Sequence, residues 1–314
     1  MLKFGRNYRL HVKIGKLIKK GDKNFTQWDE EFDITYPITI NFQITRAQFS
    51  NINTANFELY NLSDDTRTKL YRDRYPSNPP KIIRVEFYAG YGSDTQNLPL
   101  CFAGDVFDGY SDKRGGDPNI KTVLTCGVGI ISYQTSYINQ TFAKDTKPID
   151  IIKTLCNAAG LELGNPESSI IASMKPLIEP WSAVGSAIDE LKEFVGEKYV
   201  TIDGYRGVDK VWILGEDETL PQKEYYLTID DTGIFGTPKR RDMCLVVETL
   251  FEPRLMENQE LELKSSTAPY FNGKYKIVGF NHIGTISGSV GGNCKTTALL
   301  YVRGKNYNAL TTIS

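Results

Sequence analysis

The chain has 314 residues, of which 40% are hydrophobic and 24% charged, the balance of an ordinary globular protein. Its formal net charge is only −1, which excludes a strong overall attraction to nucleic acid or to an anionic membrane surface. The 18 Tyr, 15 Phe and 27 Gly residues favour strands and turns over helices. The length is enough for roughly two or three domains with cores of their own.

The five cysteines are widely spaced, and none lies near another at the spacing of a metal knuckle. An odd number of scattered cysteines favours reduced, mostly buried thiols, so we expect synthesis and folding in a cytoplasm. The first residues lack a continuous apolar core of the signal-peptide type, and no stretch is long enough to span a bilayer. We therefore expect no membrane insertion and no export by the signal-peptide route.

The first elements in chain order are strands. Residues Arg9 to Ile14 alternate apolar and polar side chains, and a charged turn, KKGDKN, follows them. The stretch from Pro37 to Leu70 is the most regular of the chain. Its alternation predicts a strand from Ile38 to Thr45, a polar turn over Gln48 to Asn53, and a returning strand that ends near Tyr60. A short helix should then run to Leu70, because Ser63 is a good N-cap and Asp64 and Asp65 place negative charge in the first turn.

The residues of this hairpin carry a family resemblance. The strand ITINFQITR (38–46) and the segment NTANFELYNLSDDTR (53–67) resemble the opening domain of bacteriophage baseplate hub proteins. Proteins of that family join the tail tube to the central spike. The resemblance implies a structural protein of the tail, and it concerns no catalytic motif.

More strands follow a proline-rich linker at 75–80. They are predicted at Ile82 to Ala89, Leu100 to Tyr110 and Lys121 to Ile131, with a turn at Gly90-Tyr91-Gly92. No helical crossover of useful length lies among them, so they should be antiparallel, in a barrel or sandwich. The glycines near 90–92 and 104 again resemble those of hub proteins, although turns and a bulge explain them physically.

The composition shifts near Lys147. Pro148 suits the first position of a helix with an apolar stripe at Ile151, Ile152 and Leu155, and Gly160 suits its end. A second helix is indicated by Val184, Ile188, Leu191 and Val195, closed by Gly196; a hairpin over 198–203 and 210–214 follows. This order of helix, linker, helix and hairpin resembles the middle domain of hub proteins.

The last region begins near Lys223. A strand from Met243 to Phe251, another around Leu261 and Leu263, and a closing hairpin over 274–283 and 295–302 are predicted. Two turns of this region resemble turns of hub proteins. The matching residues are Gly233, Gly236, Pro238, Pro253, Arg254 and Leu255. Asn258 departs from the glycine that the family often has, a mild change because asparagine also tolerates left-handed backbone.

The sequence contains little that indicates a catalytic, metal-binding or phosphate-binding site. His11 and His282, the two histidines, have no cysteine or carboxylate at ligand spacing, so a structural or surface role is favoured over a catalytic one. The pairs Asp64-Asp65 and Asp230-Asp231 fit caps and turns, because adjacent side chains do not share a face. The glycine-rich stretch 284–292 lacks the spacing of a phosphate loop and is better explained as a hairpin tip.

One charged run is a candidate contact. Lys239, Arg240 and Arg241 are most simply a solvated surface, but on a tube wall they could meet DNA phosphates or the acidic rim of a partner. No residue is assigned to catalysis, to a metal or to a cofactor.

These observations predict a mainly β protein with an α+β insert. Two antiparallel tube-like β-barrel domains, residues 1–145 and 223–305, would flank a small α+β middle domain at 146–222, with a C-terminal tail at 306–314. The hub resemblance implies a non-enzymatic virion protein in the tail baseplate, of a contractile-tail phage, assembled in the host cytoplasm. It also implies a homotrimeric ring that adapts a sixfold tail tube to a threefold central spike, with a channel for DNA in transit. Tape measure and baseplate wedge proteins are further expected partners.

Two rivals stay open at this point. A tail-associated peptidoglycan hydrolase would need a catalytic glutamate or a Cys-His pair in a cleft, which the sequence does not show. A carbohydrate-binding adhesin would suit the many tyrosines, yet these lie mainly within strand patterns.

Overall fold

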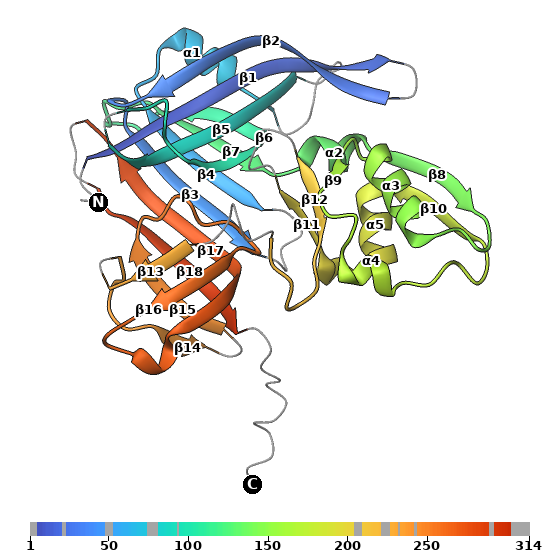
Figure 1. Cartoon of the computed structure of the whole chain (residues 1–314). Helices are drawn as coiled ribbons and strands as arrows, with labels where there is room; N and C mark the ends of the chain where they lie inside the picture. The colour runs from blue at the N-terminus through green and yellow to red at the C-terminus, as the bar shows by residue number, and fades with distance from the viewer. Residues whose placement is uncertain are drawn as a thin grey trace.

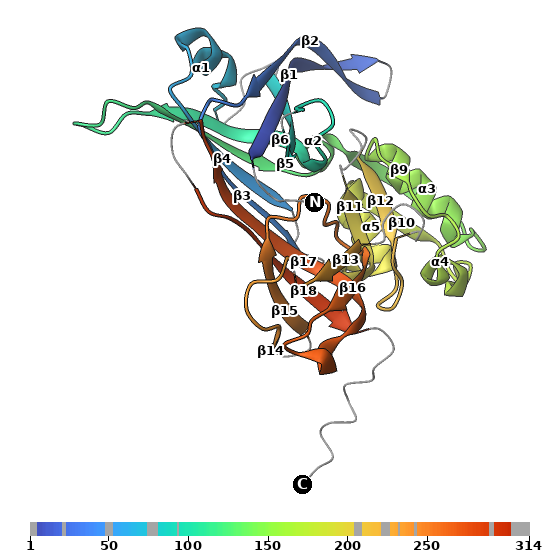
Figure 2. The ribbon, with the colours of Figure 1, turned by 60° about the vertical axis from the view of Figure 1, so that its left-hand side comes forward.

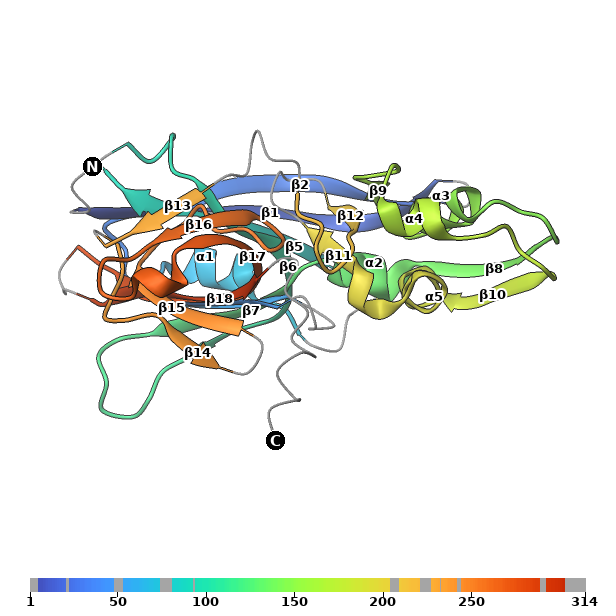
Figure 3. The same ribbon diagram turned by 60° about the horizontal axis from the view of Figure 1, so that its bottom comes forward.

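The computed structural model describes residues 5–20, 23–47, 53–73, 81–92, 94–203, 209–220, 227–231, 233–241, 244–288 and 292–302. Strands dominate it, and a smaller unit with most of the helices projects to one side of a large sheet (Figures 1 and 3). No described helix is both long enough and apolar enough to cross a bilayer. The predicted linker at 75–80, most of the turn at 48–53 and the tail at 306–314 lie outside the described residues.

The first region is a meander of antiparallel strands with one short helix. Its elements are β1 (Arg6–Lys20), β2 (Lys23–Thr35), β3 (Ile40–Ala47), β4 (Thr54–Tyr60), α1 (Asp64–Leu70), β5 (Lys81–Tyr91), β6 (Leu100–Asp112) and β7 (Lys121–Gly127). The antiparallel pairing that the sequence predicted for this region is confirmed.

The central hairpin forms as predicted. Ile40, Phe42 and Ile44 are buried, and the alternate residues of β3 face away from the core. The Ser63 side chain accepts a hydrogen bond from the backbone N–H of Thr66, so the predicted cap of α1 is confirmed.

Several predicted boundaries in this region were wrong. β1 extends well past Ile14 because β2 pairs with it along almost its whole length, and β2 had not been predicted. β5 runs on through Gly90 and Tyr91, since both pair with β1, so the turn begins only at Gly92. The strand from Lys121 ends at Gly127 rather than Ile131. Left-handed Gly129 caps a short helix there, α2 (Ile130–Thr135).

The middle region mixes short strands and helices. Its further elements are β8 (Tyr137–Phe142), α3 (Pro148–Ala158), β9 (Glu162–Leu163), α4 (Ser169–Ser173), β10 (Trp181–Ser186), α5 (Ala187–Val195), η1 (Glu197–Tyr199), β11 (Val200–Asp203) and β12 (Lys210–Ile213). The first helix with Pro148 in its first turn and the antiparallel β11–β12 hairpin are confirmed. Val184 does not belong to the second helix: it lies in β10, which pairs with β8, and α5 starts only after the Ser186 cap.

The last region completes the sheet. It contains β13 (Leu227–Asp230), β14 (Lys239–Arg241), β15 (Cys244–Leu250), β16 (Glu260–Lys264), η2 (Pro269–Phe271), β17 (Gly273–Ile286) and β18 (Cys294–Val302). The predicted strand before Phe251 and the closing β17–β18 hairpin are confirmed. The one parallel pairing in the described part of this sheet joins β13 to β16.

The first and last regions share one sheet. β17 pairs with β3, so the order runs β14-β15-β18-β17-β3-β4-β7-β6-β5-β1-β2, with β16 and β13 branching from β17. Figures 1 and 2 show β3 and β17 side by side in this curved sheet. Among the described strands the sheet does not close on itself, so two tube-like barrels remain a proposal.

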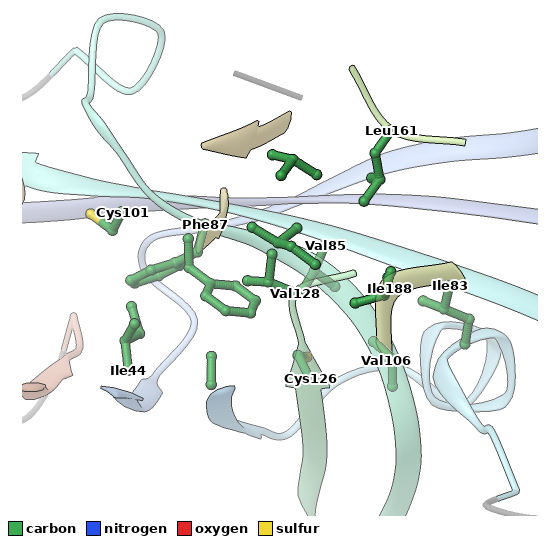
Figure 4. Packing of buried hydrophobic residues seen from close by; sticks show 14 of the residues in the cluster. Ile44, Ile83, Val85, Phe87, Cys101, Val106, Cys126, Val128, Leu161 and Ile188 are labelled. Atoms are coloured by element: carbon green, nitrogen blue, oxygen red, sulfur yellow. The ribbon is translucent and has the colours of Figure 1, made fainter. Parts of the chain in front are cut away.

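The core lies inside the curve of the sheet. Phe87 of β5 contacts the rings of Phe42 on β3 and Phe57 on β4, each with centroids 5.0 Å away. The same cluster continues into the middle region, where Leu161 and Ile188 join it (Figure 4). The last region has a second, smaller cluster around Leu261 and Leu300. The middle region is therefore packed on the first by continuous apolar contact.

Candidate functional site

The first of the two turns that resemble hub proteins, around Gly233 and Gly236, precedes the edge strand β14. Gly233 accepts a backbone hydrogen bond from Leu250 of β15, and Phe235 donates one to Glu248 of the same strand. Gly236 has φ +71°, a conformation that glycine adopts without strain. These contacts hold the chain against β15 just before β14 begins, so Gly233 and Gly236 have a structural role.

The second predicted turn meets the middle region. Leu255 is fully buried, and the guanidinium of Arg254 donates two hydrogen bonds to the carboxylate of Glu252, at 2.7 and 3.0 Å. Asn258 has φ +62°, as its tolerance of left-handed backbone suggested. Its side-chain amide donates to the hydroxyl of Thr201 in β11, at 3.1 Å.

A buried group of polar side chains, which we call the junction, joins all three regions. Arg46 of β3 is 1% exposed and lies 3.3 Å from the carboxylate of Asp203 at the end of β11. The ammonium of Lys276 in β17 donates to the carbonyl oxygens of Gly215 and Glu216 in the middle region. These contacts bind the β11–β12 hairpin and its flanks to the two strands that unite the sheet.

Glu257 lies within the junction. Its carboxylate accepts a hydrogen bond from the side-chain amide of Asn53, at 3.0 Å. Burial raises the pKa of Glu257 to about 7, an effect that Asp203 adds to and that Asn53, Arg46 and Lys276 oppose.

A second ion group clamps the same hairpin from β5. The guanidinium of Arg84 lies 2.7 Å from one carboxylate oxygen of Asp209, next to β12, and 3.4 Å from Asp105 on β6. Asp105 is 2% exposed, and burial raises its pKa to about 6 although Arg84 lowers it. The middle region is thus attached by arginines from two different strands.

The histidines take structural positions. His282 is fully buried, shares a hydrogen bond of 2.7 Å with the hydroxyl of Thr296, and has its pKa lowered to about 3 by burial, so it is neutral at physiological pH. His11 contacts Asp33 and Glu31 across the β1–β2 pair. Among the described residues no group of three or more His, Cys, Asp or Glu side chains could hold a metal ion.

The basic run forms β14, at one end of the sheet. All three of its side chains are exposed, and the strand pairs only with β15 in the described part of the chain. Arg240 is opposite Leu245, whose side chain is buried, whereas Lys239 and Arg241 are opposite Val246 and Cys244. Lys239 and Arg241 therefore lie on the face of the sheet that points away from the core.

The buried carboxyl of Glu257 makes stability depend on pH. Its pKa is higher in the folded chain than in the unfolded one, so its contribution to folding is full below about pH 4.5 and is lost as the pH rises through 7. Glu257→Gln should remove this loss, which amounts to about 3 kcal/mol at most. Between pH 5 and pH 8 the variant should gain stability relative to the parent chain, measured by denaturant unfolding. An unchanged difference across that range would contradict this assignment.

The family model described as "Baseplate hub gp41" matches residues 23–282. The chain belongs to this baseplate hub family. The match covers most of the chain and all three regions, so the resemblance inferred from the hairpin and the turns is confirmed. A comparison with curated proteins gives no match.

Solved structures with the same fold come from phage tails and from secretion systems. The 43 kDa tail protein of prophage MuSo2 from Shewanella oneidensis has 10% identity and a TM-score of 0.51, with 94% of this chain and 98% of that chain covered. The E. coli c3393 protein, a component of the type VI secretion system, has 12% identity and a TM-score of 0.53, with 85% and 74% covered. Its description notes structural similarity to the T4 bacteriophage tail proteins gp27 and gp5.

A third likeness is to a chain of the Francisella PdpA-VgrG complex, with 9% identity and a TM-score of 0.55. That match covers 96% of this chain but only 58% of the other. At these identities the likenesses establish the fold alone. Family membership establishes a structural protein of the phage tail and baseplate, and hence a place in the virion tail.

Sequence reasoning missed the junction of this hub chain. Arg46, Asp203 and Glu257 are far apart in the sequence, and each looks like an ordinary surface charge. The only local signal was at position 258, where a polar residue replaces glycine in a turn and reaches a strand of another region.

Proposed function

We propose that this hub chain assembles as a homotrimeric ring that adapts a sixfold tail tube to a threefold central spike and leaves a channel for DNA. The first and last regions, 1–145 and 223–305, would each supply one tube-like unit, with the middle region, 146–222, beside them. The tail at 306–314 would stay outside these units. Three chains with two such units each match a sixfold tube.

The observation that carries this proposal is the continuity of the sheet across both regions. A single sheet from β14 to β6 has one face on the core and one away from it. From β17 through β3 and β4 to β7, where the two regions meet, the pairing register has no irregularity, so the second face is continuous there. A wall of a tube requires such a two-sided sheet.

The face away from the core suits a channel. At its centre, in β3, β4 and β17, it presents mainly uncharged polar side chains: Asn41, Gln43, Thr45, Asn56, Asn281 and Thr285. Four of them, Asn41, Gln43, Asn56 and Thr285, also line a shallow groove, together with Glu58, Ile283 and Asn293. Uncharged polar groups offer DNA no ion pairs along the wall, so a strand could pass without being held.

A catalytic role receives no support from the histidine positions described above, and we propose a non-enzymatic protein. Tail tube and central spike proteins are the proposed direct partners, with tape measure and baseplate wedge proteins as further ones. We place the chain in a contractile tail, assembled in the host cytoplasm. Lysis of purified peptidoglycan by the pure protein, abolished by one carboxylate substitution, would contradict the non-enzymatic assignment, and binding to glycans would favour the adhesin.

The oligomeric mass tests the ring. Size-exclusion chromatography with light scattering should give three times the mass of one chain, because a closed cyclic assembly covers sheet edges that a monomer leaves open. A stable monomer at every concentration, also with tube or spike protein present, would count against the proposal. A dimer would do the same, since two chains cannot supply a threefold-to-sixfold match.

A further inference from the structure

The two ends of the large sheet carry opposite charge. β2 ends the sheet on one side and pairs only with β1 in the described part of the chain, and β14 ends it on the other. Figures 1 and 2 show these strands at opposite ends of the molecule. β2 contains the sequence Asp29-Glu30-Glu31 and, two residues on, Asp33, whereas β14 is Lys239-Arg240-Arg241.

The opposite charges lie on the same face of the sheet. Glu31 and Asp33 of β2 pair with Lys13 and His11 of β1. Leu10 and Val12 of β1 point into the core, so these four residues lie on the opposite face of the sheet. The same face can be followed to Lys239 and Arg241 of β14, because the buried residues stay on the opposite face past the register shifts in the β5–β6, β6–β7 and β17–β18 pairs. An acidic and a basic pair, each spaced by two residues, thus lie on one face of the sheet at its two open edges.

The acidic edge keeps an excess of negative charge on this face. The side chains of Glu31 and Asp33 are 50% and 36% exposed, and both contact the single imidazole of His11. Lys13 pairs with Glu86 instead, and Arg9, the remaining cation of β1 on this face, lies over the ring of Tyr88. Trp28 of the same strand is 36% exposed and adds apolar surface, as does Phe235, 47% exposed, in the turn before β14.

We propose that β2 of one copy of this chain docks edge to edge against β14 of the next, which continues the sheet from copy to copy. The inference rests on the proposed ring and names the surfaces that form it. Opposite charges that face each other across paired strands stabilise them, and like charges destabilise them. Pairing β2 with β2, or β14 with β14, would bring like charges together, so the pattern favours head-to-tail contacts. Such contacts form a ring when the rotation from one copy to the next closes, as it does in the proposed trimer.

Charged side chains on edge strands also serve to prevent association. Charges of a single sign on both edges would be enough to prevent association. Negative charge at one edge and positive charge at the other, on the same face, is therefore better explained by docking. The three residues of β14 are too few to bury the roughly 1,200–2,000 Å² of a specific interface. Edge pairing would therefore fix the register and the direction of the contact, and flanking surfaces would supply the remaining area.

Charge reversal provides the test. Glu31→Lys with Asp33→Lys makes both edges basic, and Lys239→Glu with Arg241→Glu makes both acidic. Each double variant should weaken self-association by roughly 100-fold or more, because charged groups of one sign would meet in the interface. The variant with all four substitutions should recover assembly. Lys144→Glu with Lys153→Glu, at exposed positions of the middle region, is the matched control. Light scattering measures mass, and circular dichroism checks folding.

A cross-linking experiment locates the contact directly. A carbodiimide joins a carboxylate to an amine at contact distance, so Lys239 should become linked to Glu31 or Asp33. In an equal mixture of ordinary and 15N-labelled protein, the linked peptides should include pairs of mixed label, which only contacts between copies produce. Links between two β2 peptides should be absent.

The outcomes separate this inference from the ring itself. If the chain assembles and the reversed variants assemble equally well, the edge contact is wrong and the ring stands. If the four-substitution variant fails to recover while folded, charge complementarity is wrong. If the unaltered chain is monomeric at every concentration, both the ring and the edge contact fail.

Discussion

Arg84→Ala should destabilise the chain by about 3–5 kcal/mol, because it leaves a buried carboxylate without its cation. Arg84 lies between Asp105, 2% exposed on β6, and Asp209, 11% exposed beside β12. Asp105 also accepts a weak hydrogen bond from the backbone N–H of Ile131, which cannot replace the guanidinium. The loss should appear in denaturant unfolding as a lower midpoint, and the middle region should be released first because one of its two arginine attachments is gone.

The size of this effect should depend on pH. Burial already raises the pKa of Asp105 to about 6, and removal of the arginine would raise it further. A raised pKa in the folded chain means that stability falls as the pH rises through it, so the variant should be weakest near pH 8 and partly recover near pH 5.

Two variants control for other causes. Arg67→Ala removes an arginine whose partner, Asp64, is 92% exposed, and should change the midpoint little. Arg84→Ala combined with Asp105→Asn should be more stable than Arg84→Ala alone, since the orphaned charge is gone. Equal stability of the single and double variants would show that the cost does not come from Asp105.

Local pattern predicted the elements whose own residues determine them. β3 was predicted because Ile40, Phe42 and Ile44 alternate with polar residues, and α1 because Ser63 precedes two aspartates. The same reasoning failed for β2, whose acidic run hides the alternation of Phe32 and Ile34. That strand forms because β1 offers a partner along its length. It also failed for Val184, which fits a helical stripe but is held in a strand by β8.

Contacts between distant segments could not be predicted from the sequence. The pairing of β3 with β17 unites two regions expected to be separate, and it depends on residues more than 200 positions apart. The junction follows from that pairing: Arg46 lies near the end of β3, Lys276 lies in β17, and both reach the β11–β12 hairpin and its flanks. The burial of a charged residue can be recognised only when its distant neighbours are known. The sequence therefore identified the basic run at 239–241 as a candidate contact but not the buried polar groups.

Phe87→Ala should cost about 3–5 kcal/mol of folding free energy, because it opens a cavity in the core enclosed by the sheet. Phe87 is fully buried and contacts Phe42, Phe57 and Tyr8, which lie on three other strands. Not all of these strands are adjacent in the sheet. The surrounding backbone therefore cannot collapse into the cavity without changing the curvature of the sheet. The expected result is a large fall in the unfolding midpoint with the fold retained at low temperature.

A matched surface variant and a ligand make this result specific. Phe235→Ala removes the same side chain at a position that is 47% exposed, and should leave the midpoint nearly unchanged. An apolar cavity of this kind stays dry and binds small apolar molecules, so benzene should raise the midpoint of Phe87→Ala and not that of the parent chain. A loss below about 1 kcal/mol would mean that the sheet relaxes into the space after all, and that its curvature is not fixed by the aromatic cluster.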